Sequence, residues 1–151
     1  AVVLNEINPD FIRIRTLTIN KRMSLCDETE SGKFTRATDE EILEEERLFI
    51  EYLECCSSYV SDHITNLLQE IEGRLPQDKE RMLAIIDRFR SLSPVERANF
   101  VVGRRVGIYT CLDDLYDLRK HQAVEQIMRE LGRGSNEVDE KTISTLMEGF
   151  I

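Results

Sequence analysis

Asp62 and His63 are adjacent titratable residues at the point where a short strand, Ser57–Val60, gives way to a polar run that also contains Asn66. An imidazole can carry a proton near neutral pH, and a neighbouring carboxylate can orient it. In an α/β unit, ligands bind where the chain leaves a strand for the next helix, so these three residues are candidate binding residues. The alternative, favoured because short motifs predict sites only loosely, is a local turn or cap.

Arg13 and Arg15 form a second candidate pair. They lie in the stretch Phe11–Ile19, whose β-branched residues are typical of a strand. Because side chains alternate along a strand, Ile12 and Ile14 lie on one face and the two arginines on the other. A guanidinium binds a carboxylate or phosphate with two hydrogen bonds. This face is therefore predicted either to line an anion-binding cavity or to form structural ion pairs at a solvated surface.

A helix between these two strands would bring both groups to one end of a sheet. Thr38 and Glu41 form a capping-box pattern that opens this helix, and apolar residues follow at helical spacing. They are Ile42, Phe49, Ile50 and Leu53. A strand, a helix and a second strand form a βαβ unit with parallel strands. Residues 20–37 are predicted to be a polar loop with one helical turn near Leu25.

The remainder of the chain is predicted to be helical. The polar run leads into a helix, residues 72–73 form a turn, and residues 75–76 open another helix. A second capping box, at residues 93–96, opens a further helix that Gly103 and Gly107 interrupt on one face.

The two glycines predict either close backbone approach to a neighbouring element or, at Gly107, the end of the helix. Arg104 and Arg105, which lie between them, are predicted to be surface charges.

Both ends of the chain also have helical patterns. Residues 1–7 look like the tail of a helix already under way, which predicts a fragment or an excised domain. Residues 124–131 and the segment after Asp139 carry apolar stripes that would pair as an antiparallel hairpin. We therefore divide the chain into residues 1–92, which hold the strands, and residues 93–151, a helical extension.

The composition excludes some partners and favours a compartment. The formal net charge is −9, whereas binding to a nucleic-acid backbone needs a basic face. No apolar run approaches the roughly 20 residues of a membrane span. The four cysteines form no C-x-x-C pair and no secretory signal is visible, which favours reduced thiols and a cytoplasmic protein. With two histidines and scattered cysteines, we predict no metal site.

Three stretches, in this order, carry a resemblance to a known family: PDFIRIRTLTI, VSDHITNLLQEIEGRLPQDKERMLAIID and SPVERANFVVGRRVGIYTCLDDLYD. Over residues 9 to about 115, the chain resembles the C-terminal part of radical S-adenosylmethionine (radical SAM) proteins. In that family a partial α/β barrel holds a [4Fe–4S] cluster, which binds and cleaves S-adenosylmethionine to start radical chemistry. The resemblance implies that the two strands are late barrel strands and that the helices after Ser93 are a C-terminal extension.

The chain departs from the family in its cysteines. The cluster motif C-x3-C-x2-C is absent, and the residues Cys26, Cys55, Cys56 and Cys111 have a different spacing. Residues 21–25 also replace the Gly-Thr-Pro-Leu turn that many relatives carry. We therefore expect no cofactor to be bound by this chain alone, and the resemblance assigns the [4Fe–4S] cluster and S-adenosylmethionine to a parent protein.

The resemblance also implies roles for the candidate residues. Arg13 and Arg15 would line the barrel interior and meet a carboxylate of cofactor or substrate. Asp62, His63 and Asn66 would lie at the carboxyl-terminal rim of the last strands. There His63 would donate a hydrogen bond or carry a proton, with Asp62 as its orienting partner.

Two hypotheses result. In the first, the fold is α/β and helix-dominated, a partial (βα) barrel fragment with two parallel strands and a C-terminal helical extension. The chain would be the C-terminal fragment of a radical SAM iron–sulfur oxidoreductase-like protein, and would form part of the barrel wall and the substrate side. Its partners would be the rest of the parent chain and, through an exposed strand edge, a second copy.

The alternative is a non-catalytic helical protein–protein interaction domain. Arginines that share a polar cavity with His63 would favour the first hypothesis. Solvated arginines, together with an exposed groove along the C-terminal helices, would favour the second.

Overall fold

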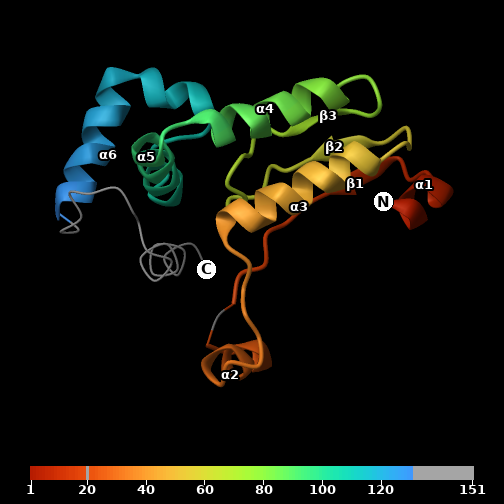
Figure 1. Cartoon of the computed structure of the whole chain (residues 1–151), viewed down its shortest axis with the longest axis horizontal. Helices are drawn as coiled ribbons and strands as arrows, with labels where there is room; N and C mark the ends of the chain where they lie inside the picture. Colours follow the sequence, from red (N-terminus) through yellow and green to blue (C-terminus); the bar gives the residue numbers. More distant parts are fainter. Residues whose placement is uncertain (20, 131–151) are drawn as a thin grey trace.

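The structure, a computed structural model, describes residues 1–19 and 21–130. In chain order its elements are α1 (Val2–Ile7), β1 (Phe11–Arg13), α2 (Ser24–Glu30), α3 (Asp39–Tyr52), β2 (Ser58–Val60), β3 (Glu72–Arg74), α4 (Lys79–Ser91), α5 (Pro94–Arg105), the 3-10 helix η1 (Leu112–Tyr116) and α6 (Leu118–Glu130). Helices dominate, as predicted, and a small mixed sheet accompanies them (Figure 1). The predicted helix after Asp139 lies outside the described residues.

The sheet has the strand order β1-β2-β3. β1 and β2 are parallel, with Ile12 opposite Tyr59, and α3 connects them, which confirms the predicted βαβ unit. β3 is antiparallel to β2, with Gly73 opposite Tyr59. The prediction of a turn at residues 72–73, and of a helix directly after the polar run, was therefore wrong. Glu72, Gly73 and Arg74 have low strand propensity, and pairing with β2 outweighs that local preference.

β1 is shorter than the predicted strand over residues 11–19. Ile14 N–H still donates to Val60 C=O at 3.0 Å, but the next amide that points the same way, Thr16 N–H, donates to the side-chain oxygen of Asn66 at 2.7 Å. A side chain thus replaces the strand partner, and the chain leaves the sheet for the projecting segment that carries α2 (Figure 1). α2 has seven residues rather than the single turn predicted.

The two predicted capping boxes are confirmed. At the start of α3, Glu41 N–H donates to Thr38 Oγ1 at 3.1 Å, and Thr38 N–H donates to Glu41 Oε2 at 2.8 Å. Ser93 and Glu96 make the same pair of bonds at the start of α5. Each box satisfies amides that the first turn of a helix leaves without an intrahelical partner.

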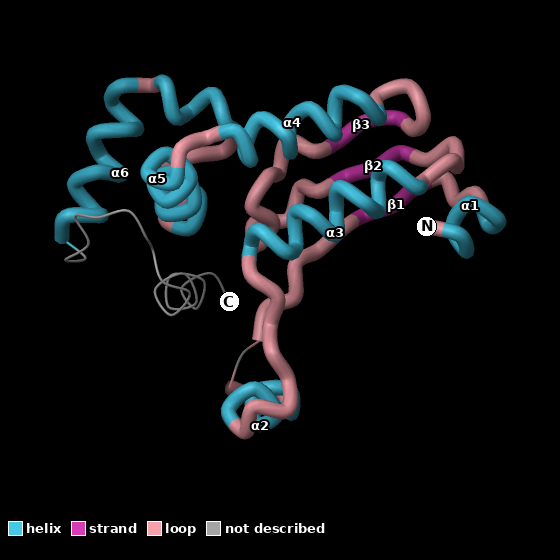
Figure 2. The backbone as a smooth tube through the Cα atoms, viewed as in Figure 1, coloured by secondary structure: helices cyan, strands magenta, loops and turns pink. Residues whose placement is uncertain are grey.

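The two faces of the β1–β2 pair differ in how well they are covered. Tyr59 is fully buried and contacts Phe49 of α3, with ring centroids 6.5 Å apart, and Ile12 lies beside it in the core. α3 and α4 lie next to each other along the strands (Figure 2). On the opposite face, Phe11 is 55% exposed and Arg13 is exposed. One face of this parallel pair is therefore largely open to solvent.

The end of α5 is buried, contrary to expectation. Arg104 and Arg105, predicted to be surface charges, are 3% and 2% exposed. The close approach predicted at Gly103 is confirmed, because a Cβ there would lie 2.1 Å from Cδ2 of Tyr109. The helix ends at Arg105, and Gly107 takes a positive φ of 75° just after it. This end of α5 packs on all sides because neighbouring segments supply hydrogen-bond acceptors for the two guanidinium groups.

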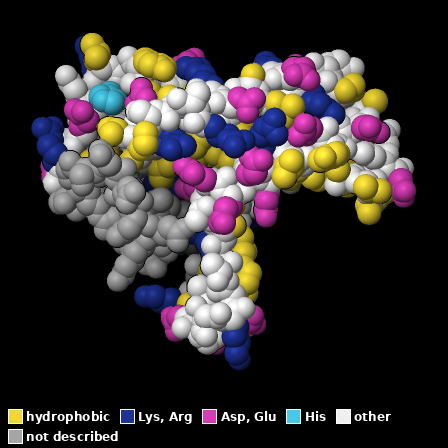
Figure 3. All heavy atoms as spheres, in the orientation of Figure 1, with side chains coloured by type: hydrophobic (Ala, Val, Ile, Leu, Met, Phe, Trp, Pro, Cys, Tyr) yellow, Lys and Arg dark blue, Asp and Glu magenta, His cyan; other side chains and the backbone are white. Residues whose placement is uncertain are grey.

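Hydrophobic side chains also gather on the surface over α1 and the adjoining end of α3 (Figure 3), where Val2, Leu48 and Tyr52 are exposed.

Within residues 1–19 and 21–130, no helix combines the length and apolar character needed to cross a membrane.

Candidate functional site

The carboxyl ends of β1 and β2 bring together four of the five residues selected from the sequence. Arg13, the last residue of β1, forms a two-point ion pair with Asp62, which follows β2. Its Nε donates to Asp62 Oδ1 at 2.8 Å and its second bond joins the other carboxylate oxygen at 3.1 Å. Both side chains are about half exposed, at 55% and 48%. The pair is thus accessible and can exchange its carboxylate for one on a ligand.

Arg15 contacts His63, just as Arg13 contacts Asp62. The Arg15 guanidinium bonds to Nε2 of His63, and Nδ1 of His63 lies 2.7 Å from the Thr65 hydroxyl. A guanidinium can only donate, so Nε2 is the acceptor in this contact. The Thr65 N–H also lies 3.3 Å from Nδ1, so Thr65 contacts this ring nitrogen through both its hydroxyl and its amide. The Thr65 hydroxyl in turn donates to Thr16 C=O at 3.3 Å.

These contacts keep His63 neutral. Partial burial, with the positive charges of Arg15 and Arg13, lowers the pKa of His63, and the Asp62 carboxylate opposes the shift only weakly. The expectation that Asp62 orients the imidazole differs from this geometry. Asp62 is held by Arg13, and Thr65 holds the ring instead. His63 can act as a base at Nε2 only after Arg15 moves away.

Asn66, the fifth candidate, is buried beneath this rim and cross-links the two strand ends. Its carbonyl accepts from Thr16 N–H, and its amide nitrogen donates to Ile14 C=O at 2.9 Å and to both oxygens of Ser61 at 3.0–3.1 Å. At 2% exposure it has no surface for a ligand. Its role is structural, because it fixes the distance between the segments that carry Arg15 and His63.

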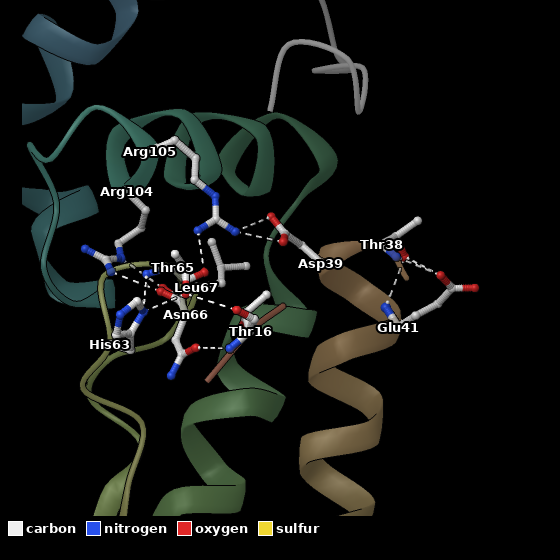
Figure 4. Close-up of polar contacts among 10 residues, drawn as sticks. All are labelled: Thr16, Thr38, Asp39, Glu41, His63, Thr65, Asn66, Leu67, Arg104 and Arg105. Carbon is white, nitrogen blue, oxygen red and sulfur yellow. Dashed lines mark hydrogen bonds and ion pairs between the residues drawn. The ribbon is translucent and has the colours of Figure 1, made fainter. Parts of the chain in front are cut away.

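The buried arginines of α5 hold the loop after β2 from the other side (Figure 4). Arg104 donates to Leu67, Tyr109 and Asn66 C=O at 2.6–3.1 Å. Burial lowers the pKa of Arg104 to about 10, so it stays charged at neutral pH.

Arg105 donates to Thr65 C=O at 2.8 Å and forms a two-point ion pair with Asp39, at 2.8 and 2.9 Å. Two helices that are distant in sequence, α3 and α5, thereby fix the loop that positions His63. We refer to Arg104 and Arg105 with these contacts as the arginine clamp.

The sequence contained a signal for the clamp. Arg104 and Arg105 stand four residues after Phe100 and Val101, so they continue the apolar side of the helix. Both of those residues are buried. Arginine on the core side of a helix indicates buried acceptors, which the surface interpretation overlooked.

The cysteines do not suit a [4Fe–4S] cluster. Cys26 lies on the projecting α2, Cys55 is buried ahead of β2 beside exposed Cys56, and Cys111 precedes η1. Among the residues that the structure describes, no three His, Cys, Asp or Glu side chains are grouped as metal ligands. A cluster of this type needs several thiolates around one point, so these residues do not fit the group.

Comparisons of the chain with protein-family models, curated proteins and solved structures found no match.

Proposed function

We propose that this chain forms the late-strand wall and substrate side of a radical SAM iron–sulfur oxidoreductase-like protein, and that it is not catalytic by itself. The proposal rests on the sequence resemblance together with one structural observation, the incomplete cover of the β1–β2 pair. Parallel strands in α/β proteins are normally covered on both faces. Here α3 covers one face, whereas Phe11 and Arg13 leave the other open.

The edge of β1 supports the same proposal. Ser58 N–H donates to Asp10 C=O and Ile14 N–H donates to Val60 C=O. Because parallel strands alternate their bonding direction, the amides and carbonyls of Phe11 and Arg13 point to the other edge. In the described residues β1 has a partner on one side only. Further barrel strands from the parent chain would pair at this edge, and its open face would become the barrel interior.

In this arrangement the rim residues face the substrate. Arg13 and Arg15 bring two positive charges, Asp62 one negative charge, and His63 is neutral, so the group attracts an anion. A carboxylate of the substrate or of S-adenosylmethionine would take the place of Asp62 on Arg13. The cluster ligands are assigned to a segment outside these 151 residues, because the cysteines of this chain do not fit the cluster.

One of the two observations that would favour the alternative, a helical interaction domain, is present, because Arg13 and Arg15 are both exposed. The other, an exposed groove along the C-terminal helices, has less support. Val124 of α6 is fully buried, and Ile127 and Met128 pack against the core. These apolar side chains of α6 are thus covered by the chain itself and do not form an exposed groove.

The test is to express the reading frame that contains this chain with all of its upstream coding sequence, and to reconstitute it anaerobically with iron and sulfide. We expect about four iron atoms per chain and reductive consumption of S-adenosylmethionine. The 151-residue chain treated in the same way is expected to bind no stoichiometric iron. Absence of iron from the longer protein, or a full cluster on the short chain, would contradict the proposal.

The site is tested in the longer protein by a matched pair of histidine variants. His63→Gln is expected to slow turnover by about tenfold or more with unchanged iron content, because it disrupts the rim at Arg15. His121→Gln, the control, changes the only other histidine, which lies on α6. Equal rates for the two variants would remove His63 from the substrate side.

A further inference from the structure

A pocket of about 560 Å³ lies on α3, and neither Arg13 nor Asp62 lines it. It is lined by the segment that follows β1, by residues 34–37 and by α3, with Tyr59 of β2. Its apolar lining includes Phe34, Ile42 and Phe49. This volume falls in the range of small-molecule sites, which combine apolar walls with a few polar groups.

Glu46 is the buried acid of this pocket. It is 8% exposed and lines the pocket, and its Oε1 accepts from the Tyr59 hydroxyl at 3.0 Å. Ser61 contributes a second hydrogen bond. Within the described part of the chain, Glu46 is in no ion pair, whereas Asp39, similarly buried, pairs with Arg105. A buried carboxylate without a cation is costly, because two neutral donors do not replace its hydration.

The other charged groups around the pocket do not neutralise Glu46. Arg15 and Arg36 line it from the segments on either side of α2, and Glu45 lines it from α3. Arg15 is already bonded to His63, and neither arginine contributes to the pKa of Glu46. Burial raises that pKa to about 7, against the opposing hydrogen bonds of Tyr59 and Ser61. Glu46 is therefore partly ionised at neutral pH. A cationic ligand would supply the counter-charge that the carboxylate lacks and would shift Glu46 to its ionised form.

We propose that this pocket binds a small primary amine with an apolar body, the ammonium group pairing with Glu46 and the body lying against Phe34 and Phe49. The proposal does not rest on the proposed radical chemistry, because Glu46 and the apolar wall residues Phe34 and Phe49 are not rim residues. Arg15 belongs to both the rim and the pocket lining. Amines of this class occur free or as α-amino acids. The second source carries a carboxylate beside the ammonium group.

Phenethylamine is the first probe, titrated into the whole chain by calorimetry at about pH 8, where the amine is charged and Glu46 ionised. We expect Glu46→Gln to weaken binding by about tenfold or more, since a charge-assisted bond is lost. Glu45→Gln is the matched control, because Glu45 lines the same pocket from the same helix but is exposed. It is expected to change affinity by less than about twofold.

The neutral analogue 2-phenylethanol and a second pH complete the test. The amine is expected to bind more weakly at about pH 5.5, where Glu46 is protonated, whereas the alcohol keeps the same weak affinity. This wild-type profile also serves if Glu46→Gln fails to fold.

Phenylalanine separates the two sources of the amine. If phenylalanine binds more tightly than phenethylamine, the site is supported and its ligand is an amino acid. If phenylalanine binds more weakly, the site is supported and its ligand is a free amine. The proposal is overturned if neither amine binds, if the alcohol binds as well as the amine, or if affinity does not change with pH.

Discussion

Arg105 and Asp39 form the most deeply buried ion pair among the described residues, with side chains 2% and 8% exposed. Removing one partner leaves the other charge buried without compensation, which costs more than the pair itself contributes. The clamp also holds the Thr65 carbonyl. Its role is therefore to specify one position for the loop after β2, rather than to add surface charge.

We expect Asp39→Ala to destabilise the fold by about 3 kcal/mol, because Arg105 then lacks its counter-charge. Glu40→Ala is the control, since Glu40 pairs with Arg97 between the same two helices but is 68% exposed. That variant should cost less than about 1 kcal/mol. Urea unfolding followed by circular dichroism gives both values. Equal losses would show that the Arg105–Asp39 pair behaves as a surface contact.

Glu46 makes stability depend on pH. Its pKa is raised from 4.5 to about 7 in the folded protein, so the folded state holds more protons than the unfolded chain within this window. Its contribution is full below about pH 4.5 and is lost as pH rises through about 7. One pH unit corresponds to about 1.4 kcal/mol, so the loss reaches about 3 kcal/mol.

Relative to the wild type, Glu46→Gln should therefore gain up to about 3 kcal/mol between about pH 4.5 and pH 8. Urea unfolding at several pH values measures the difference. Glu45→Gln should leave the wild-type profile unchanged. A constant difference between wild type and Glu46→Gln would mean that the carboxyl is not desolvated.

At the scale of elements, the junction after α5 depends on Gly103. The Tyr109 ring lies directly on the position of a Cβ at residue 103, and its hydroxyl donates to Asn99 at 2.7 Å. Tyr109 also stacks on Phe100, with centroids 5.9 Å apart. Since the Tyr109 carbonyl accepts from Arg104, displacement of this ring also disturbs the clamp.

Gly103→Ala should therefore destabilise the protein by about 2 kcal/mol or more, despite the better helix propensity of alanine. Gly32→Ala is a useful comparison, because Gly32 has a positive φ of 72° but no atom within 4 Å of the added Cβ. It should cost about 1 kcal/mol, from backbone strain alone. Thermal unfolding distinguishes them. A tolerated Gly103→Ala would require the Tyr109 ring to have room to move.

At the scale of the whole molecule, the open edge and face of β1 are available for association. Exposed edges pair with other strands unless charges or bulges block them. When the chain is isolated, a second copy would pair with the edge of β1. This is the same edge at which we propose that the remaining barrel strands pair.

We expect the isolated chain to associate with increasing concentration, and Phe11→Lys to weaken association by about tenfold, because a charge then lies on the open face. Val95→Lys is the matched control. Val95 is 54% exposed and Phe11 55%, but Val95 lies on the first turn of α5. Sedimentation velocity measures both. A chain that stays monomeric throughout, or equal effects of the two variants, would exclude the edge as an interface.

Local signals in the sequence determined the helix starts and the βαβ unit. The boxes at Thr38 and Ser93 are formed by residues three positions apart, so their energetics are complete within a single turn. The strand–helix–strand order likewise limits the strands to a parallel pair whose carboxyl ends share one edge. This is why Arg13, Arg15, Asp62 and His63 could be grouped from sequence alone.

Only the tertiary structure decided which partners those side chains have and which charges are buried. Asp62 could bond to His63 or to Arg13, and the choice depends on the register of β1 against β2. Arg105 and Glu46 are buried, although they carry the same charges as the partly exposed Arg97 on α5 and the exposed Glu45 on α3. Their burial depends on loops and strands distant in sequence, because the free energy of a charge is set by its surroundings rather than by its own type.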